Sequence, residues 1–281
     1  MAELIDGKKV ATKIKQELKL EVEKLKQKGI NPKLAVIMVG NDSASKIYVK
    51  NKSKACNETE IDFEEFLLPE STQMGELLNL IDELNNRKDI HGILLQSPIP
   101  KHLDIKKAFD NISYKKDVDG FHPINVGKLS IGEDSFISCT PYGITKLLEE
   151  YNIETEGKHV VIIGRSNIVG KPLIQCMLNK NATVTICHSK TKNIEDITKS
   201  ADILIAALGK AKFVKADMVK EGVVIIDVGI NRNELGKLEG DVDFEEVEKK
   251  ASYITPVPGG VGPMTIAMLM NNIVKAAKEN C

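Results

Sequence analysis

In the first half of the chain, segments with apolar residues at helical spacing alternate with short continuous apolar runs. Residues 8–28 carry apolar side chains at helical spacing among many lysines and glutamates, which predicts an amphipathic helix with a solvated outer face. Gly29 ends this helix, and the apolar run 34–39 has the length and content of a buried strand. Residues 74–86 and 92–96 repeat the alternation as a second helix and strand. Strands separated by helices predict β-α-β units and a mostly parallel sheet, hence an α/β fold.

The second half repeats this alternation around a glycine-bearing turn. The apolar run 159–163 predicts a strand that opens into a turn from Gly164 to Gly170, after which Lys171-Pro172 begin a helix. Further strand patterns follow at residues 183–187, 202–206 and 223–228. A strand, a glycine turn and a helix in this order aim backbone N–H groups and a helix dipole at a phosphate. This half therefore predicts a Rossmann-like domain.

The turn does not by itself prove a nucleotide site, because G-x-x-x-x-x-G lacks the middle glycine of the standard fingerprint. An NAD site usually places an acid after the second strand, to bind the ribose 2′-hydroxyl. Here that strand ends in Cys187-His188-Ser189-Lys190, and Arg165 adds a cation beside the turn. The absence of an acid after the second strand and the presence of hydrogen-bond donors there favour a ribose 2′-phosphate, and hence NADP over NAD. Solvated His188 and Lys190 side chains remain the alternative.

Composition and charge narrow the class of protein. A chain of 281 residues is long for one core, so two domains are expected. A formal net charge of −1 argues against a nucleic-acid or membrane partner held by bulk electrostatics. No apolar run approaches the roughly 20 residues of a membrane helix, and the N-terminus lacks the features of a signal peptide. The histidines are too dispersed to predict a metal site.

Cysteine usage predicts a reducing, cytoplasmic setting. The cysteines are odd in number, scattered and never in a C-x-x-C pair, which argues against a disulfide framework or a structural zinc. They are Cys56, Cys139, Cys176, Cys187 and Cys281.

Residues 117–132, rich in glycine, proline and asparagine, predict a passage between the two domains. A helix over 141–151, capped by Thr140, should follow. We place the first domain at residues 1–119 and the second at 120–281. The last helix, about 263–281, is compatible with packing back on the first domain.

Tyr48 and Lys52 lie one turn apart in a segment that Ser45 can cap as a helix. An aromatic ring beside an amine suits a flat heterocycle that exchanges a proton, whereas the alternative is a solvated lysine-rich helix face. Gln96 stands at the carboxyl end of a predicted strand, where open α/β sheets bind their ligands.

Two loops complete the candidate chemistry. Asp117-Val118-Asp119-Gly120 places two acids at the predicted domain junction, although loop carboxylates are often turn formers. The segment 254–263 holds three glycines and three prolines within eight residues, a stiff backbone that can approach a ligand closely.

Taken together, these segments resemble the methylenetetrahydrofolate dehydrogenase/cyclohydrolase family, the bifunctional folate enzymes. Six motifs stand in the family's order and span nearly the whole chain. They are Y-V-K-N-K-S-K-A-C (Tyr48 to Cys56), L-L-Q-S-P-I-P (Leu94 to Pro100), K-D-V-D-G-F (Lys116 to Phe121), C-T-P-Y-G (Cys139 to Gly143), G-R-S-N-I-V-G-K-P (Gly164 to Pro172) and P-V-P-G-G-V-G-P-M-T (Pro256 to Thr265).

The resemblance implies two activities in one cleft between a folate-binding domain and an NADP domain. NADP oxidises 5,10-methylenetetrahydrofolate to 5,10-methenyltetrahydrofolate, which water then opens to 10-formyltetrahydrofolate. It also implies a homodimer that serves one-carbon metabolism and purine biosynthesis. Water attack needs proton transfer, and a lysine transfers protons near neutral pH only if its pKa falls well below about 10.4.

The resemblance assigns residue roles as well. Lys52 handles protons in the hydrolytic step, Tyr48 stacks on the folate, and Gln96 orients the lysine. Asp119 holds the pterin, whose amino-pyrimidine edge suits a carboxylate. Pro258 and Gly259 complete the substrate contacts. The cofactor contacts are Gly164, Arg165, Ser166, Ser189 and the backbone near Ile230.

Two departures from the family pattern flank these residues, and both concern packing. Ser97 stands where a hydrophobic residue is frequent, and Ser138 where proline often precedes C-T-P. The competing interpretations are a two-domain NADP dehydrogenase for a small hydroxy or amino acid, and a nucleotide-fold binding protein without chemistry. The first would need an arginine clamp, and the first half offers only Arg87. Intact Tyr48, Lys52 and Asp119 speak against the second.

Overall fold

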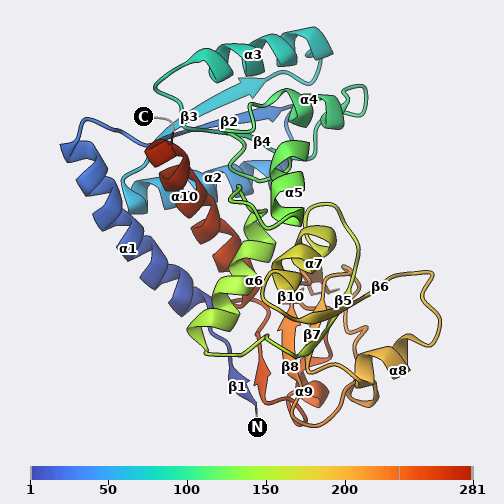
Figure 1. Cartoon of the computed structure of the whole chain (residues 1–281). Helices are drawn as coiled ribbons and strands as arrows, with labels where there is room; N and C mark the ends of the chain where they lie inside the picture. The colour runs from blue at the N-terminus through green and yellow to red at the C-terminus, as the bar shows by residue number, and fades with distance from the viewer. Residues whose placement is uncertain (1, 234, 280–281) are drawn as a thin grey trace. The chain divides into compact units, whose positions relative to one another are not determined.

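The computed structural model describes residues 2–233 and 235–279 and divides the chain into two compact units. Unit 1 comprises residues 1–11 and 138–265, and unit 2 comprises residues 12–137 and 266–281. The sequence-derived ranges differ, since they place the boundary after residue 119 and residues 1–11 in the first domain. The last helix groups with unit 2, the arrangement that the sequence left open. Figure 1 follows the chain through both units.

Unit 2 is built on a parallel sheet with the strand order β3-β2-β4. Strand β2 (Lys33–Val39) is central and buried, and β4 (Gly92–Leu95) is buried as well, as predicted. Strand β3 (Asp62–Leu68) was not predicted. It is an edge strand with exposed and half-buried positions, so its sequence lacks the apolar run that identified the other two strands.

The helices of unit 2 include all three predicted helices of the first half and two that the sequence analysis missed. They are α1 (Gly7–Gln27), α2 (Ser43–Thr59), α3 (Met74–Asn86), α4 (Ile105–Asn111), α5 (Pro123–Ser130) and the larger part of α10 (Val261–Glu279). Helix α5 lies inside the segment 117–132, which the sequence analysis treated as a passage between domains. The sequence analysis did not predict this short helix, which has proline in its first turn.

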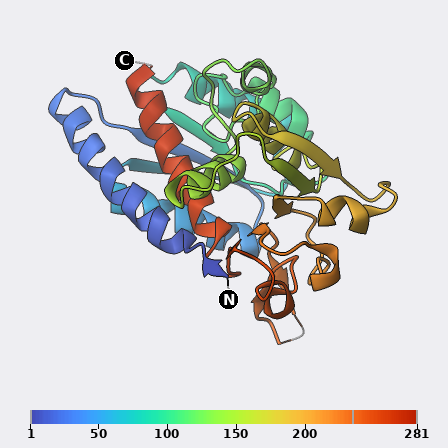
Figure 2. The same ribbon diagram turned by 60° about the horizontal axis from the view of Figure 1, so that its bottom comes forward.

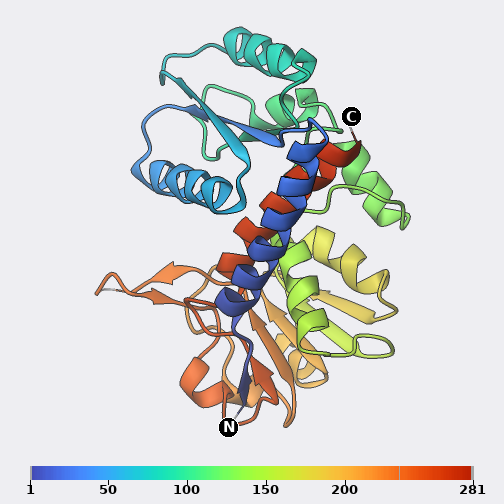
Figure 3. The same ribbon diagram turned by 90° about the vertical axis from the view of Figure 1, so that its left-hand side faces the viewer.

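Helix α10 joins the end of the chain to the body of unit 2. Ile273 packs where Gly92 of β4 leaves room beside Val118. Figure 2 shows α10, in red at the end of the chain, beside α1, in blue. Lys278 pairs with Glu21 of α1 at 2.6 Å, and Figure 3 shows the two helices side by side. Leu269, Met270 and Ile273 of this helix are buried. This packing explains why the last helix groups with unit 2.

Unit 1 holds a parallel sheet with the strand order β1-β11-β8-β7-β5-β6. The strands are β1 (Glu3–Leu4), β5 (His159–Ile163), β6 (Thr183–Cys187), β7 (Ile203–Ala206), β8 (Val224–Asp227) and β11 (Tyr253–Ile254), with a hairpin of β9 (Asn231–Arg232) and β10 (Leu238–Glu239) beside them. The fold class, α/β with parallel sheets in two domains, is confirmed. The two-residue strands β1 and β11 are too short to carry a sequence pattern.

The helices of unit 1 are shorter than α1 and α10. They are α6 (Cys139–Glu150), α7 (Gly170–Leu178), α8 (Ile194–Lys199), the 3₁₀ turn η1 (Ala216–Met218) and α9 (Phe244–Val247). Thr140 does not cap α6, because the helix begins at Cys139 and Ser138 is the cap residue. The Thr140 hydroxyl instead bonds that of Thr265 at 2.9 Å.

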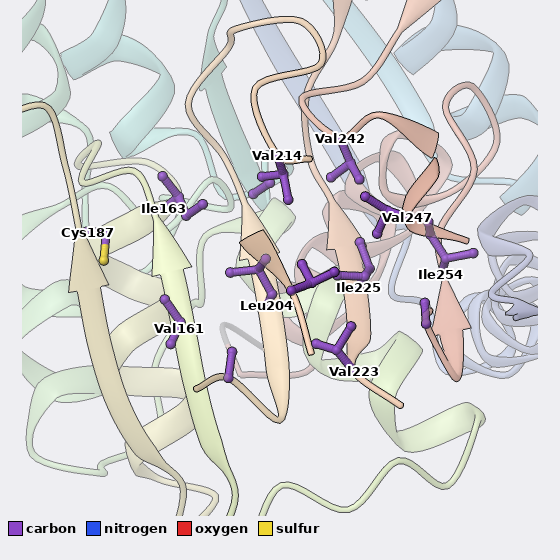
Figure 4. Close-up of a cluster of buried hydrophobic side chains, with 14 residues drawn as sticks. Val161, Ile163, Cys187, Leu204, Val214, Val223, Ile225, Val242, Val247 and Ile254 are labelled. Atoms are coloured by element: carbon purple, nitrogen blue, oxygen red, sulfur yellow. The ribbon is translucent and has the colours of Figure 1, made fainter. Parts of the chain in front are cut away.

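The core of unit 1 is aliphatic, as the low aromatic content predicts. Side chains from neighbouring strands interdigitate on one face of the sheet, among them Val161, Leu204 and Ile225 (Figure 4). No helix among the described residues is long and apolar enough to cross a membrane. Cys281, one of the cysteines counted in the sequence, lies outside the described residues.

Candidate functional site

Helix α2 presents Tyr48 and Lys52 on one side and buries the other. Asp42 caps the helix, because its carboxylate accepts the Ser45 backbone N–H at 2.7 Å. The prediction of Ser45 as cap is therefore wrong by three residues: Ser45 supplies the donor, and Asp42 the acceptor. Val49 packs inward, whereas the Tyr48 side chain is 48% exposed and Lys52 is half-buried. This leaves the ring and the amine accessible to a ligand.

Gln96 meets Lys52 directly. The Lys52 Nζ donates to Gln96 Oε1 at 2.8 Å. The Gln96 Nε2 donates to the Ser97 carbonyl at 2.6 Å, and the Gln96 backbone N–H donates to Ile37 in the sheet at 2.8 Å. Because the amide nitrogen is engaged by a carbonyl, the amide oxygen must face the lysine. A 93% buried glutamine thus fixes the position of the ammonium group.

A buried thiol lies one helical turn after Lys52. Cys56 donates to the Met270 sulfur at 3.7 Å, and burial raises the pKa of this thiol to about 12 although the Lys52 charge acts to lower it. The thiol is therefore neutral at physiological pH. Lys52 has an apolar, uncharged neighbour on this side of the helix.

Asp119 lies in a turn beside β4. Asp117 forms an isolated parallel bridge with Ile93 of β4, and the chain turns at residues 118–119, where the Gly120 N–H donates to the Asp117 carbonyl at 3.1 Å. The Asp117 carboxylate is buried and accepts N–H groups from Phe121 at 3.2 Å and His122 at 2.8 Å, which closes the loop. Burial raises the pKa of Asp117. Asp117 therefore shapes the loop, while half-buried Asp119 is presented by it.

Asn272 holds the same loop from α10. Its amide donates to the carbonyls of Val118 at 2.8 Å and Ile137 at 3.0 Å. The sequence analysis missed this residue, although a buried asparagine on the apolar face of a helix is itself a sign of a structural hydrogen bond.

The glycine turn of unit 1 has the geometry of a phosphate site. Gly164 follows β5 with φ of +126°, and a Cβ there would lie 2.1 Å from the Ala207 carbonyl. A Cβ on Gly170 would meet the Gly164 carbonyl, also at 2.1 Å. Both positions therefore require glycine. The turn leads into α7, whose helix dipole favours an anion at this end.

Ser166 closes the turn from within. Its hydroxyl oxygen accepts N–H groups from Val169 at 3.1 Å and Gly170 at 3.4 Å. These bonds leave the hydroxyl hydrogen for a ligand oxygen. Arg165 and Ser166 are both exposed, so the residues fit a bound phosphate.

Ser138 anchors the turn from α6. This buried hydroxyl donates to the Ile168 carbonyl at 2.6 Å. The departure from proline at this position, which the sequence analysis treated as a matter of packing, thus adds a hydrogen bond to the phosphate turn. Proline could not make this bond.

The other predicted site residues of unit 1, for the cofactor and for the substrate, follow the ends of parallel strands in one sheet. Ser189 comes two residues after β6, and Gly164 donates to the Cys187 carbonyl at 2.9 Å. Exposed Ile230 follows β8, and Pro258 and Gly259 follow β11. The carboxyl edge of such a sheet is where nucleotides bind, so the unit 1 residues gather at one edge. The folate candidates Tyr48, Lys52, Gln96 and Asp119 belong to unit 2.

Comparison with known proteins identifies the class. Residues 5–119 match the tetrahydrofolate dehydrogenase/cyclohydrolase catalytic domain, and residues 138–281 match the NAD(P)-binding domain of the same family. The chain belongs to this family, which confirms the resemblance read from its motifs.

Individual relatives agree over the full length. The chain is 59% identical to the Bifunctional protein FolD of Oceanobacillus iheyensis, over 99% of this chain and 98% of the relative. Its structure resembles the crystal structure of the bifunctional methylenetetrahydrofolate dehydrogenase/cyclohydrolase FolD from Campylobacter jejuni, with a TM-score of 0.99, 54% identity and full coverage of both chains. A Trypanosoma brucei homologue, solved with NADP and an inhibitor, gives a TM-score of 0.94 at 37% identity, over 99% of this chain and 98% of that one.

Proposed function

We propose that this protein is a bifunctional enzyme, which uses NADP to oxidise 5,10-methylenetetrahydrofolate and then hydrolyses the product. In the first step NADP⁺ takes a hydride from the methylene carbon, leaving 5,10-methenyltetrahydrofolate as a cation and NADPH. In the second step water adds to that carbon, the ring opens to 10-formyltetrahydrofolate, and one proton is released. Family membership and full-length likeness to enzymes of this name support the proposal.

The hydrogen bond from Lys52 to Gln96 is the observation that carries the hydrolytic half. The oxidation needs no base, because the two nitrogens beside the carbon share the developing positive charge. Water attack needs a group that accepts a proton and returns it to the leaving nitrogen. Lys52, held by a buried glutamine, is the group that we assign to this transfer. Tyr48, one turn away, offers its ring to the flat pterin.

The remaining roles follow the two units. We assign NADP binding to unit 1 and folate binding mainly to unit 2, where Asp119 accepts N–H groups from the pterin edge; the substrate contacts Pro258 and Gly259 belong to unit 1. Arg165 and Ser189 bind the 2′-phosphate, while Gly164, Ser166 and the backbone near Ile230 bind the rest of the cofactor. Pro258 and Gly259 are assigned to substrate contact. The bound NADP supplies the hydride acceptor; the residues named here only bind and orient the reactants.

One assay tests the whole proposal. The purified protein is mixed with 5,10-methylenetetrahydrofolate and NADP⁺, and absorbance is followed for NADPH and for the methenyl intermediate. Supplying methenyltetrahydrofolate alone tests the hydrolysis without the cofactor. Reduction of NADP⁺ by a small hydroxy acid, or no reaction with either folate, would reject the assignment.

The cellular setting is part of the same proposal. We place the enzyme in the cytoplasm, in one-carbon metabolism that supplies purine biosynthesis, as a homodimer without a nucleic-acid or membrane partner. Four buried thiols form no disulfide in the described part of the chain, which suits a reducing compartment: Cys56, Cys139, Cys176 and Cys187. Light scattering of the purified protein tests the dimer: a mass of one chain at assay concentration would reject it.

A further inference from the structure

Two carboxylates without an assigned role are buried at the carboxyl edge of the unit 1 sheet. Asp227 is the last residue of β8 and is 4% exposed, and Asp241 is fully buried. Burying a charge is costly unless hydrogen bonds replace the lost water. The hydrogen bonds that Asp227 and Asp241 accept show which segments of the chain the two carboxylates fix in place.

Asp241 binds the loop that follows β7. Its Oδ2 accepts the backbone N–H groups of Leu208 at 2.7 Å and Gly209 at 2.9 Å, and its Oδ1 accepts that of Lys210 at 2.7 Å. The Asn231 side chain donates to the same Oδ1 at 3.0 Å. Four donors match the acceptor capacity of a carboxylate. One side chain therefore fixes three consecutive amides of the loop and the turn after β8.

Asp227 in turn binds Asp241. Its carboxylate accepts the backbone N–H groups of Gly229 at 2.9 Å, Asp241 at 2.9 Å and Val242 at 3.0 Å. Burial is the main reason why the pKa of Asp227 rises to about 6, and the nearby Asp241 charge adds to it. The two acids thus form a chain of contacts from β8 to the loop after β7.

Glycines allow the backbone to approach these carboxylates. A Cβ on Gly240 would lie 1.8 Å from Asp227 Oδ2, and one on Gly229 would lie 2.4 Å from Asp241 Oδ1. Side chains at these two positions would displace the acids. The close approach therefore requires glycine beside each acid, in D-V-G at residues 227–229 and in G-D-V at residues 240–242.

The main chain and the core support the same segment. Val242 pairs with Val214 in parallel, and both side chains lie in the aliphatic core (Figure 4). The Lys212 backbone N–H donates to the Gly240 carbonyl at 3.1 Å. The residues that carry the acids are thus held in place, so the acids can act as fixed anchors for the loop after β7.

That loop forms one wall of the phosphate turn. The Ala207 carbonyl is the group that a Cβ on Gly164 would strike, at 2.1 Å. The Ala207 backbone N–H donates to the Ile163 carbonyl at 2.8 Å. A shift of residues 208–210 would therefore be transmitted through Ala207 to the turn that receives the cofactor.

We propose that Asp227 and Asp241 form a carboxylate clamp that holds the loop after β7 and the turn after β8 in the shape that binds NADP. Both are positioning residues for the cofactor. The proposal rests on NADP being the cofactor, and it is independent of the roles assigned to Lys52, Gln96 and Asp119. Asparagine cannot replace either acid, because its NH₂ group would face an N–H donor.

The test compares two functions of one protein. We expect Asp241→Asn to weaken NADP binding, measured by titration calorimetry, by about tenfold or more, since bonds to a charged acceptor are among the strong ones. Hydrolysis of methenyltetrahydrofolate, which needs no cofactor, should stay near the wild-type rate. The matched control is Asp243→Asn, two residues away, whose carboxylate pairs with Lys215 at 2.8 Å outside the clamp. It should leave both values unchanged.

Amide exchange of the wild-type protein gives a second measurement that needs no variant. Gly209 and Lys210 are exposed residues, yet their N–H groups should exchange slowly because Asp241 holds them. Exchange at the rate of an open loop would overturn the proposal. So would NADP binding by Asp241→Asn at wild-type affinity, or a parallel loss of binding and hydrolysis in that variant.

Discussion

The two candidate sites differ in what they are made of. In unit 2 the proposed proton transfer depends on side chains: Lys52 on a helix, and Gln96 at a strand end, which bonds it at 2.8 Å. In unit 1 the phosphate turn depends on the backbone, because residues 164 and 170 must be glycine. A proton-transfer site fails when one functional group is lost, whereas a backbone site fails when its shape is lost. Substitutions should separate these two kinds of dependence.

Lys52→Met should give the largest effect. It keeps an unbranched side chain of similar length but removes the amine, so hydrolysis of methenyltetrahydrofolate should fall by about 10²–10⁴-fold. NADP affinity should not change, because the substitution leaves unit 1 intact. Stopped-flow absorbance measures the hydrolysis, and calorimetry the cofactor. Lys50→Met, on the exposed side of the same helix, is the control. Near-normal hydrolysis by Lys52→Met would remove Lys52 from the mechanism.

Arg165→Ala should come second and should act on one cofactor only. Charge-assisted bonds to a phosphate contribute about 1.5–3 kcal/mol each, so KM for NADP should rise by about tenfold or more. KM for NAD, which lacks the 2′-phosphate, should change little. Arg232→Ala, in the β9–β10 hairpin, serves as the control. Equal losses for both cofactors would show that Arg165 supports the turn and does not bind the phosphate.

How well the sequence predicted each site follows from the same difference. Tyr48, Lys52 and Gln96 were identified from residue type and spacing, and the structure brings Lys52 and Gln96 together as expected. The turn from Gly164 to Gly170 was found from its glycines, since only a backbone requirement explains them. Buried strands such as β2, β4 and β5 were found because their side chains are mostly apolar.

What the sequence did not reveal is mostly tertiary. Edge strand β3 and short helix α5 lack a clear hydrophobic period. At the start of α2, both Asp42 and Ser45 are residue types that cap helices, and only the structure shows that Asp42 is the cap. Asn272 and Asp241 could not be placed, because the groups they bind lie far along the chain. The hydrogen bond of the Ser138 hydroxyl was missed for the same reason, since its acceptor, the Ile168 carbonyl, is 30 residues away along the chain.

Asp119→Ala should reduce both reactions in parallel. An unpaired pterin donor in a partly dry site costs about 1–3 kcal/mol, so kcat/KM for folate should fall by roughly 5- to 150-fold in each assay. Asp110→Ala, whose carboxylate pairs with Lys106 on α4, is the control. A loss confined to one reaction would contradict a shared pterin contact.

Asp117 needs a different measurement from Asp119. The sequence predicts that it matters less for folate, but its buried carboxylate closes the loop. Asp117→Asn should therefore lower the melting temperature, whereas Asp119→Ala should leave it near the wild-type value. The reverse pattern would exchange the two roles.

Ser138→Ala should give the smallest effect and tests how far the backbone site depends on a single anchor. It removes one neutral hydrogen bond, to the Ile168 carbonyl, worth about 0.5–1.5 kcal/mol. NADP affinity should therefore fall by only about 2- to 12-fold, and hydrolysis should not change. Thr145→Ala removes a buried hydroxyl from the middle of α6, where it bonds Pro141 at 3.0 Å, and serves as the control. If both variants bind NADP like the wild type, Ser166 and the glycines suffice to shape the turn without help from α6.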